Sequence, residues 1–301
     1  MNPGGQTCKR SLGDHRLVRL AVRRNLRGFH ERCSNPRTQY QGLADVPPLH
    51  RLPYITQVTR ESRFSYLCNQ CGRCCRDKVI TISPYDLIRI ARAAGLSTAE
   101  AIGRYTLRRG SLLLFNQDGK CAALEGVACT IHNGRPLACR LYPLGLEHDS
   151  NGSRFIALDP AAGSAGVYGN DSTVAEFVEG QGVASYFAGI DLYAKLIERF
   201  RDRIIAIADF DKIELADFRR RAIREALAES NYDYNPLIDA LFEADSVCAG
   251  RVLIDLPLSA HIEALSDLLA RESDPFRVAS ASAMLALSLG YRPDTALVMR
   301  W

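Results

Sequence analysis

Hydrophobic residues recur every three or four positions through the C-terminal half of the chain, which is the spacing of one face of an α-helix. This pattern predicts a long helix through residues 190–207 and two more through 215–226 and 258–269. The positions that carry the pattern are Ile190, Tyr193, Ile197, Phe200, Ile204, Ile207, Leu215, Phe218, Ala222, Ala226, Leu258, Ile262, Leu265 and Leu269. His261 falls on the last apolar face, where a lone histidine is more often a packed core residue than a ligand.

Two helix starts are predicted before this region from capping residues. Ser83 favours an N-cap, Pro84 the first helical position, and Gly95 the end of the same helix. Ser97 with Glu100 three residues later forms the pattern of a capping box, which predicts a second helix immediately afterwards.

The same N-terminal half contains short apolar runs that alternate with turn signals. Strands are expected at residues 79–82, 112–115 and 127–131, with tight turns at Asp118-Gly119 and Asn133-Gly134. A short helix carrying Cys139 and Arg140 is expected after Arg135-Pro136.

These patterns predict an α+β fold, in which a small irregular cysteine-rich module with short strands packs on a mainly helical C-terminal part. The expected divisions are a basic, poorly ordered arm over residues 1–59 and the cysteine module over 60–148. A Gly-, Ser- and Ala-rich connector with one strand, 154–158, is expected over 149–171, and the helical region over 172–301.

The chain of 301 residues has a net charge of +4, which is unevenly spread. Residues 1–60 hold eleven Lys and Arg against three Asp and Glu, giving +8 there and −4 over the rest. We expect this arm to be a solvated tail with one Arg-rich helix, about 14–27, rather than a nucleic-acid-binding segment.

The hydrophobic runs also bear on location. The longest, such as Leu112 to Phe115, are too short to span a bilayer, so no membrane association is expected. Arginines interrupt the apolar residues between 16 and 24, which argues against a signal peptide. Both observations predict a cytoplasmic protein, in which thiols stay reduced and disulfides are rare.

The cysteines are far more clustered than the other residues. Seven of the ten fall in one window: Cys68, Cys71, Cys74, Cys75, Cys121, Cys129 and Cys139. A cluster this dense in a cytoplasmic chain predicts a site for a soft metal, since thiolate sulfur binds zinc, copper(I) and iron–sulfur clusters. The other three, Cys8, Cys33 and Cys248, are expected to be free or structural thiols.

Two kinds of metal centre compete for these thiols. Zinc takes four ligands, usually as two close pairs, whereas a [4Fe–4S] cluster often takes a C-x₂-C-x₂-C run and a distant fourth cysteine. Cys68, Cys71 and Cys74 make such a run, and Gly72 allows the backbone to wrap closely around a cluster. Cys139, in Cys-Arg-Leu-Tyr-Pro, is a suitable remote ligand.

We favour Cys71, Cys74 or Cys75, Cys129 and Cys139 as the four ligands. Adjacent side chains rarely bind one metal without strain, so one of the pair Cys74-Cys75 is expected to serve a second site or to be a reactive thiol. Seven cysteines are too few for two separate all-cysteine sites of four.

Other residues around the cluster leave alternatives open. Cys121 and Cys129 are candidates for a second or bridged site, and His132 is a candidate nitrogen ligand. Four arginines flank the cysteines: Arg73, Arg76, Arg135 and Arg140. They would either offset the thiolate charge and lower thiol pKa values or form a solvated basic face.

The cysteine pattern resembles a known family. Phe64-x₃-Cys68-x₂-Cys71-x₂-Cys74-Cys75, Ser83-Pro84-x-Asp86, Cys129-Thr-Ile-His132 and Arg135-Pro-x₂-Cys139-Arg-x-Tyr-Pro143 are similar to the YkgJ-type cysteine-cluster family. That family is described as chelating zinc or iron, and the resemblance covers about residues 60–145. The family includes flagellin lysine N-methylase, which implies that one branch uses such a module in methyl transfer to protein lysines. We do not carry that activity over, because the resemblance lies in the metal module alone.

These observations favour a cytoplasmic [4Fe–4S]-binding protein whose action on a protein substrate or partner is open. A structural zinc module acting in protein interaction is the first alternative, and a cluster-dependent protein lysine methyltransferase is the second. The chain has no Gly-rich strand-turn-helix pattern of the nucleotide-binding kind, so the sequence itself does not supply an enzymatic activity.

Overall fold

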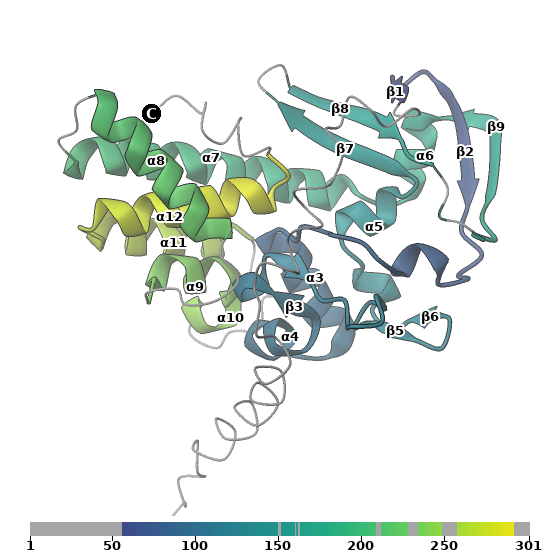
Figure 1. Cartoon of the computed structure of the whole chain (residues 1–301), viewed down its shortest axis with the longest axis horizontal. Helices are drawn as coiled ribbons and strands as arrows, with labels where there is room; N and C mark the ends of the chain where they lie inside the picture. The colour runs from purple at the N-terminus through teal and green to yellow at the C-terminus, as the bar shows by residue number, and fades with distance from the viewer. Residues whose placement is uncertain are drawn as a thin grey trace, which may run out of the picture. The chain divides into compact units, whose positions relative to one another are not determined.

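The computed structural model describes residues 56–149, 152–159, 161, 163–208, 212–227, 234–248 and 258–291. The chain divides into residues Met1–Pro53 and Tyr54–Trp301, and every described residue belongs to the second unit. The helix expected at 14–27, together with Cys8 and Cys33, lies outside the described residues. Short strands and the cysteine-rich region come first and a mainly helical part follows (Figure 1), so the α+β prediction is confirmed.

The strands form four small antiparallel sheets. They are β1 (Thr56–Val58), β2 (Arg63–Leu67), β3 (Thr106–Leu107), β4 (Leu112–Leu113), β5 (Leu124–Glu125), β6 (Ala128–Cys129), β7 (Leu144–Asp149), β8 (Gly152–Ala157) and β9 (Val167–Thr173). β8 lies between β1 and β7, while β2 pairs with β9, β3 with β4 and β5 with β6. The register sets Leu146 opposite Phe155 and Tyr66 opposite Tyr168.

The helices include three short 3₁₀ turns within the cysteine region. These are η2 (Arg73–Cys75), η3 (Arg108–Gly110) and η4 (His132–Gly134). The α-helices are α3 (Pro84–Ala94), α4 (Thr98–Tyr105), α5 (Leu137–Leu141), α6 (Val174–Gly180), α7 (Ala184–Ile207), α8 (Lys212–Leu227), α9 (Pro236–Phe242), α10 (Ala244–Val247), α11 (Leu258–Arg271) and α12 (Pro275–Ser288). In the part of the chain that the structure describes, no helix combines the length and apolarity that crossing a bilayer requires.

The predicted helix starts of the cysteine region are confirmed. Ser83 caps α3 by accepting from the backbone N–H of Asp86, whose side chain accepts in return from the N–H of Ser83. Ser97 and Glu100 make the same reciprocal pair at the start of α4. Gly95 ends α3 in the left-handed conformation, at φ 67°, as expected for a C-cap glycine.

The expected strands in this region are shorter than predicted. Residues 79–82 form only an isolated bridge, from Thr81 to Leu112, and Val79 is 75% exposed. The cap of α3 at Ser83 follows immediately, so the extended segment has no room to lengthen. The strand expected at 112–115 shrinks to β4, and that at 127–131 shrinks to β6.

Residues 149–171, expected to be a connector with one strand, contribute more to the sheets than that. β8 begins at Gly152 and lies at the centre of a three-stranded sheet. β9 was missed because Gly169, Asn170 and Asp171 are poor strand formers, and its pairing with β2 supplies what local propensity does not.

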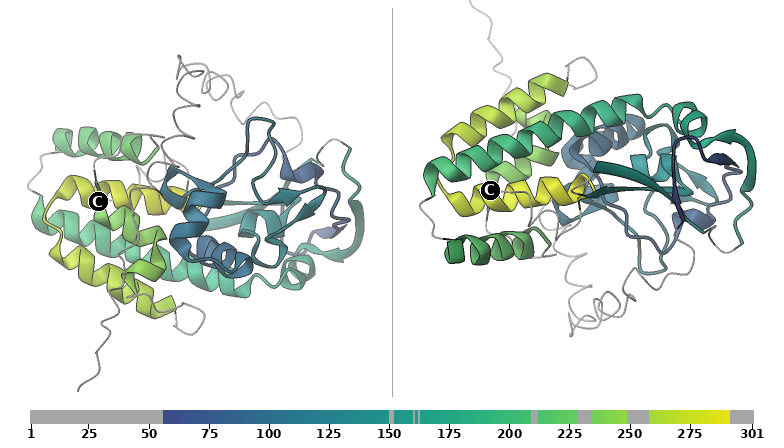
Figure 2. Two further views of the ribbon diagram at one scale, coloured as in Figure 1. Left: turned by 90° about the horizontal axis from the view of Figure 1, so that it is seen from below. Right: turned by 90° about the horizontal axis from the view of Figure 1, so that it is seen from above.

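The predicted helices of the C-terminal part are present, and their apolar faces form its core. α12 packs against α7, α8 and α9, and Figure 2 shows α12 running beside α7 in both views. His261 on α11 is fully buried, with Nδ1 sharing a hydrogen bond with Tyr193 Oη (2.8 Å) and Nε2 facing the Ala240 carbonyl (2.9 Å). The prediction of a packed core histidine is therefore confirmed.

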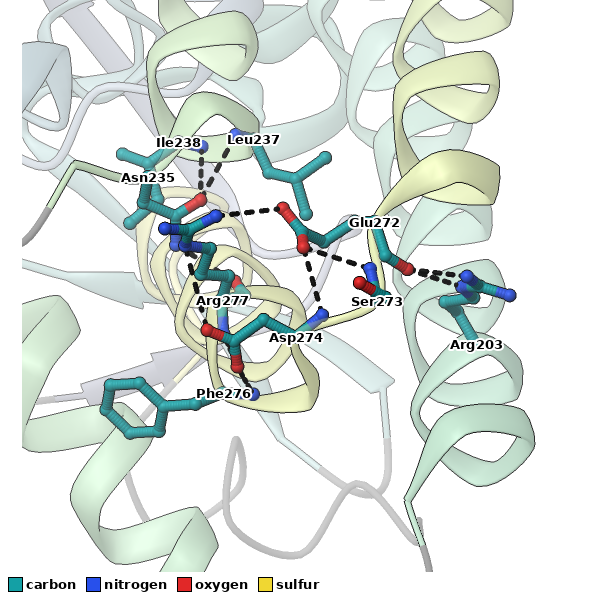
Figure 3. Close-up of polar contacts among 9 residues, drawn as sticks. All are labelled: Arg203, Asn235, Leu237, Ile238, Glu272, Ser273, Asp274, Phe276 and Arg277. Atoms are coloured by element: carbon teal, nitrogen blue, oxygen red, sulfur yellow. Dashed lines mark hydrogen bonds and ion pairs between the residues drawn. The ribbon is translucent and has the colours of Figure 1, made fainter.

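Polar contacts at the junction of α11 and α12 fix the helical part (Figure 3). Glu272 accepts two backbone N–H groups that follow it, and its carbonyl accepts from the guanidinium of Arg203 on α7 at 2.6 and 2.9 Å. Asp274 caps α12. The amide of Asn235, the cap of α9, donates to the carbonyl of Arg277 at 2.9 Å, so α7 and α9 both contact the junction of α11 and α12.

Candidate metal centre

The vicinal pair Cys74 and Cys75 lies on η2, a single turn that Gly72 makes possible. Gly72 has φ +70°, and a Cβ there would lie 3.3 Å from a Leu124 methyl carbon and from the Val127 carbonyl oxygen. A left-handed backbone and a close approach both favour glycine. The turn closes when the N–H of Cys75 donates to the Gly72 carbonyl at 3.2 Å. The close approach at Gly72 is to the β5–β6 hairpin, and the wrapping of the backbone around a cluster stays a prediction.

Backbone hydrogen bonds bring the next two cysteines to the same place. The N–H of Cys121 donates to the carbonyl of Cys75 at 3.0 Å. Cys129 pairs with Leu124 in the β5–β6 hairpin, whose first strand is tied to the Cys121 carbonyl by the N–H of Leu124 at 3.0 Å. Cys121 and Cys129, which lie about fifty residues after η2 in the sequence, are therefore connected to that turn through the hairpin.

Cys139 lies on α5, which is hydrogen-bonded to α3. The backbone N–H of Leu137, the first residue of α5, donates to Asp86 Oδ1 at 2.7 Å. Gly134 lies so close to α3 that a Cβ there would be 2.1 Å from the Arg89 carbonyl oxygen. These contacts with α3 therefore fix the position of the segment that carries Cys139.

Five thiols from these segments interact electrostatically, and we call them the inner cysteines: Cys74, Cys75, Cys121, Cys129 and Cys139. Burial raises the pKa of the Cys139 thiol, and the charges of Cys121, Cys129 and Cys74 raise it further. Burial and the charge of Cys74 likewise raise the pKa of Cys129, while the backbone N–H of Ile131 and the charge of Arg135 oppose that rise. Mutual repulsion of this kind requires the sulfur atoms to lie near one another.

The vicinal pair splits into an acidic and a basic thiol. The hydrogen bond with the Cys75 thiol lowers the pKa of Cys74, and the positive charges of Lys78 and Arg135 act in the same direction. The same hydrogen bond, together with burial, raises the pKa of Cys75. One thiol of the pair is therefore easier to deprotonate than the other, and the thiolate is the form that binds metals.

The remaining two thiols, Cys68 and Cys71, form the outer cysteines. Cys68 is exposed, and its sulfur accepts from the N–H of Gln70 at 3.4 Å. Cys71 accepts from the N–H of Ala165 at 3.4 Å, and this bond with that from the Arg73 backbone lowers its pKa, although burial and the charge of Cys74 oppose the shift. Ser164 adds a side-chain hydrogen bond. Sequence reasoning missed this contact, because residues 161–166 read only as a Gly- and Ala-rich connector.

A group of tyrosines borders the outer cysteines and was also missed. The ring of Tyr66 lies 5.9 Å from that of Tyr142 and 4.8 Å from that of Tyr168, measured between centroids. Burial, followed by the charge of Cys68, raises the pKa of Tyr66 to about 12. Tyr66 and Tyr168 meet through the β2–β9 pairing, which no local sequence pattern indicates.

The flanking basic residues have different roles. Arg135 lowers the pKa of Cys74 and Cys129, as expected of a counter-charge. Arg140 instead donates to Tyr186 Oη (3.1 Å), to the Gln181 carbonyl (3.1 Å) and to the Asn133 carbonyl (2.5 Å). The His132 ring lies against the Arg135 guanidinium, and burial, followed by the charges of Arg135 and Arg140, lowers the pKa of His132.

The donor set suits a soft metal in its chemistry. Among the described residues, no three His, Cys, Asp or Glu side chains are arranged as ligands of a single metal ion. The inner cysteines nevertheless offer five sulfur donors, drawn from η2, the β5–β6 region and α5. Zinc and iron are the metals that all-thiolate sites of this kind bind in proteins.

Residues 67–158 match the family model CxxCxxCC, described as "Putative zinc- or iron-chelating domain". This segment is similar to that domain over its whole length. The match begins one residue before Cys68, contains all inner and outer cysteines, and continues through β8. No curated protein and no solved structure matches the chain.

Proposed function

We propose that the CxxCxxCC domain binds a [4Fe–4S] cluster through four inner cysteines: Cys74, Cys121, Cys129 and Cys139. The observation that carries this proposal is the backbone contact that brings η2 to the segment before β5, where the N–H of Cys121 donates to the Cys75 carbonyl at 3.0 Å. The effect of Cys121 and Cys129 on the pKa of Cys139 supports it. A [4Fe–4S] cluster takes four thiolates, commonly with one ligand remote in sequence from the others. When bound, such a cluster supplies one-electron chemistry or a Lewis-acidic iron.

The electrostatics favour loading of a metal centre. Burial and neighbouring thiolates raise the pKa of Cys139, so four clustered thiolates are costly without a cation. A bound metal removes this repulsion and keeps its ligands deprotonated. Arg135 provides a further positive charge beside Cys74 and Cys129.

This ligand set differs in one member from the set that the sequence favours. Cys121 replaces Cys71, because Cys121 acts on the pKa of Cys139 whereas Cys71 is hydrogen-bonded to Ala165. Cys75 is not a ligand in this set, because its thiol forms a hydrogen bond with Cys74. Seven cysteines then divide into four ligands, one hydrogen-bond donor and two outer cysteines.

Metal and sulfide analysis of protein purified without oxygen tests the proposal. The expected result is a brown protein with about four iron and four inorganic sulfide per chain. Colourless protein that holds zinc, with no sulfide, would contradict it.

A structural zinc site is the second candidate, and the hairpin arrangement favours it. Zinc takes four ligands, and here the β5–β6 region supplies Cys121 and Cys129 beside one thiol of η2 and Cys139. Such a site would stabilise a loop-rich region that has few strands of its own. One zinc per chain, retained under anaerobic conditions and released with loss of structure, would support this candidate.

Methyl transfer to protein lysines, implied by the family resemblance, stays a prediction. Methyl transfer first requires binding of a methyl donor, and calorimetry of the cluster-loaded protein with S-adenosylmethionine measures that binding. Absence of binding to that loaded form would count against the activity.

A further inference from the structure

We propose that Asp86 is a positioning residue for Cys139, acting through the backbone N–H of Leu137 at the start of α5. The inference rests on the proposed function in that Cys139 is a ligand of the metal centre. Asp86 is 5% exposed and lies on α3, far from Cys139 in sequence.

The two carboxylate oxygens of Asp86 serve two different elements. Oδ2 accepts from the N–H of Ser83 at 2.9 Å and from its Oγ–H at 2.6 Å, which completes the cap of α3. Oδ1 accepts from the N–H of Leu137 at 2.7 Å. The second oxygen therefore holds a segment that the cap of α3 does not need.

The other capping boxes in the described residues show what capping alone requires. At α4 and α6, Glu100 and Glu176 are exposed, and Oε2 of each accepts both the N–H and the O–H of the capping residue. The second oxygen of each glutamate has no part in the box. At α3 the acid is shorter and buried, and its second oxygen accepts from another helix. The difference points to a role beyond helix capping.

Helix α5 depends on this contact because it is short and lacks a side-chain cap of its own. It has five residues, and its N-cap, Pro136, makes no side-chain cap hydrogen bond. The first N–H of a helix has no partner within that helix, so an outside acceptor must supply one when the end is buried. Asp86 supplies it, and Cys139 follows Leu137 by two residues.

The charge of the buried Asp86 carboxylate also supports a role in positioning α5. Burial raises the pKa of Asp86, and the charge of Arg140 on α5 opposes that rise. The same carboxylate raises the pKa of Cys139. Burying a carboxylate beside clustered thiols lowers the stability of the fold, and a neutral capping residue would avoid that loss. The hydrogen bond between Asp86 and α5 offsets part of this loss.

The test uses two pairs of variants and two measurements. Asp86→Ala removes both contacts, and Asp245→Ala is its control, because Asp245 also accepts a helix N-terminal N–H, that of Thr98 (2.7 Å), but on α4. Leu137→Pro removes the donated N–H at a first helical position where proline is tolerated, and Leu137→Ala removes the side chain while keeping that N–H.

The first measurement is the rate at which iodoacetamide alkylates Cys139 in metal-free, reduced protein, followed by peptide mass mapping. Asp86→Ala and Leu137→Pro should raise this rate by about tenfold, the equivalent of one lost hydrogen bond. Asp245→Ala and Leu137→Ala should leave it within twofold of the unaltered protein. This measurement needs no metal, so it is independent of the proposed function.

The second measurement is metal affinity, taken with Co²⁺ through its thiolate charge-transfer absorption. Asp86→Ala should weaken binding by roughly 10- to 100-fold, as loss of an outer partner of a ligand commonly does. Asp86→Asn, which keeps one accepting oxygen, should fall between. Equal Cys139 alkylation rates in Leu137→Pro and Leu137→Ala would overturn the inference, even if Asp86→Ala failed to fold. Faster alkylation without any Co²⁺ binding in the unaltered protein would refute the metal centre and keep the positioning role.

Discussion

The backbone N–H of Cys121 donates to the carbonyl of Cys75 at 3.0 Å, although these residues are far apart in the chain. This hydrogen bond joins η2 to the segment that enters the β5–β6 hairpin. Because it involves backbone atoms, it holds the two segments together whatever the state of the thiols. The segments that carry Cys75 and Cys121 are thus held together by the backbone, independently of any metal.

The division into inner and outer cysteines predicts a clear pattern of single substitutions. Cys129→Ala and Cys139→Ala should each abolish cluster loading, because a four-thiolate site loses a ligand. Cys68→Ala should retain iron and sulfide close to the unaltered content, since Cys68 is exposed and outside the inner group. Cys248→Ala, on the turn after α10, is the control for loss of an unrelated thiol. Full loading of Cys139→Ala would show that the ligand set is wrong.

Gly72 should be more sensitive to substitution than another glycine with the same backbone conformation. Gly126 has φ +60° and nothing within 4 Å of the position that a Cβ would take, whereas Gly72 has φ +70° and contacts at 3.3 Å. Both alanine variants should lose about 1 kcal/mol of unfolding free energy from left-handed strain. Gly72→Ala should lose more, and only it should weaken metal binding. Denaturant titration and Co²⁺ binding measure the difference, and equal effects in both variants would contradict the close-approach argument.

Arg135 should control the reactivity of Cys74. Its positive charge helps to lower the pKa of that thiol, so Arg135→Gln should raise the pKa and reduce the thiolate fraction at pH 7. The rate of Cys74 alkylation in metal-free protein should fall accordingly. Arg220→Gln, on α8, replaces an exposed arginine paired with Asp217 and serves as the control. An unchanged pH profile for Cys74 in Arg135→Gln would rule out this charge effect.

His261 should make the helical part sensitive to acid. Burial lowers its pKa from 6.5 to about 4, while an unfolded chain has the ordinary value. The unfolded state therefore binds more protons between these values, and stability falls as pH decreases from about 6.5 to 4. The full loss is about 3 kcal/mol.

The matched variant for this prediction is His261→Gln, which removes the titrating ring. Its unfolding free energy, measured by urea titration at pH 7 and pH 5 in metal-free protein, should change less with pH than that of the unaltered protein. Metal ligands and carboxylates titrate in both proteins, so the difference between the two isolates His261. Identical pH dependence in both would show that the ring contributes nothing to acid sensitivity.

Local rules predicted the elements that depend on neighbours in sequence. Ser83, Pro84 and Gly95 bounded α3 correctly, and the apolar spacing found α7 and α11, because caps and amphipathic faces are set within a few residues. The pairing of β2 with β9 was not predictable in this way. Its strands are separated by about a hundred residues, and β9 contains Gly, Asn and Asp.

The candidate site was predicted in its chemistry and only in part in its geometry. Clustered cysteines indicated a soft-metal module, and the family match to residues 67–158 agrees with that prediction. The separation of Cys71 from the inner group depends on a hydrogen bond from Ala165, and the support of Cys139 depends on Asp86. Both contacts join distant segments, so no spacing rule could reveal them.

X-ray absorption at the iron edge of anaerobically prepared protein tests the central claim most directly. We predict a shell of sulfur neighbours together with iron–iron scattering, both lost in Cys139→Ala and kept in Cys68→Ala. A spectrum at the zinc edge with sulfur neighbours and no iron in the sample would contradict the proposed [4Fe–4S] cluster.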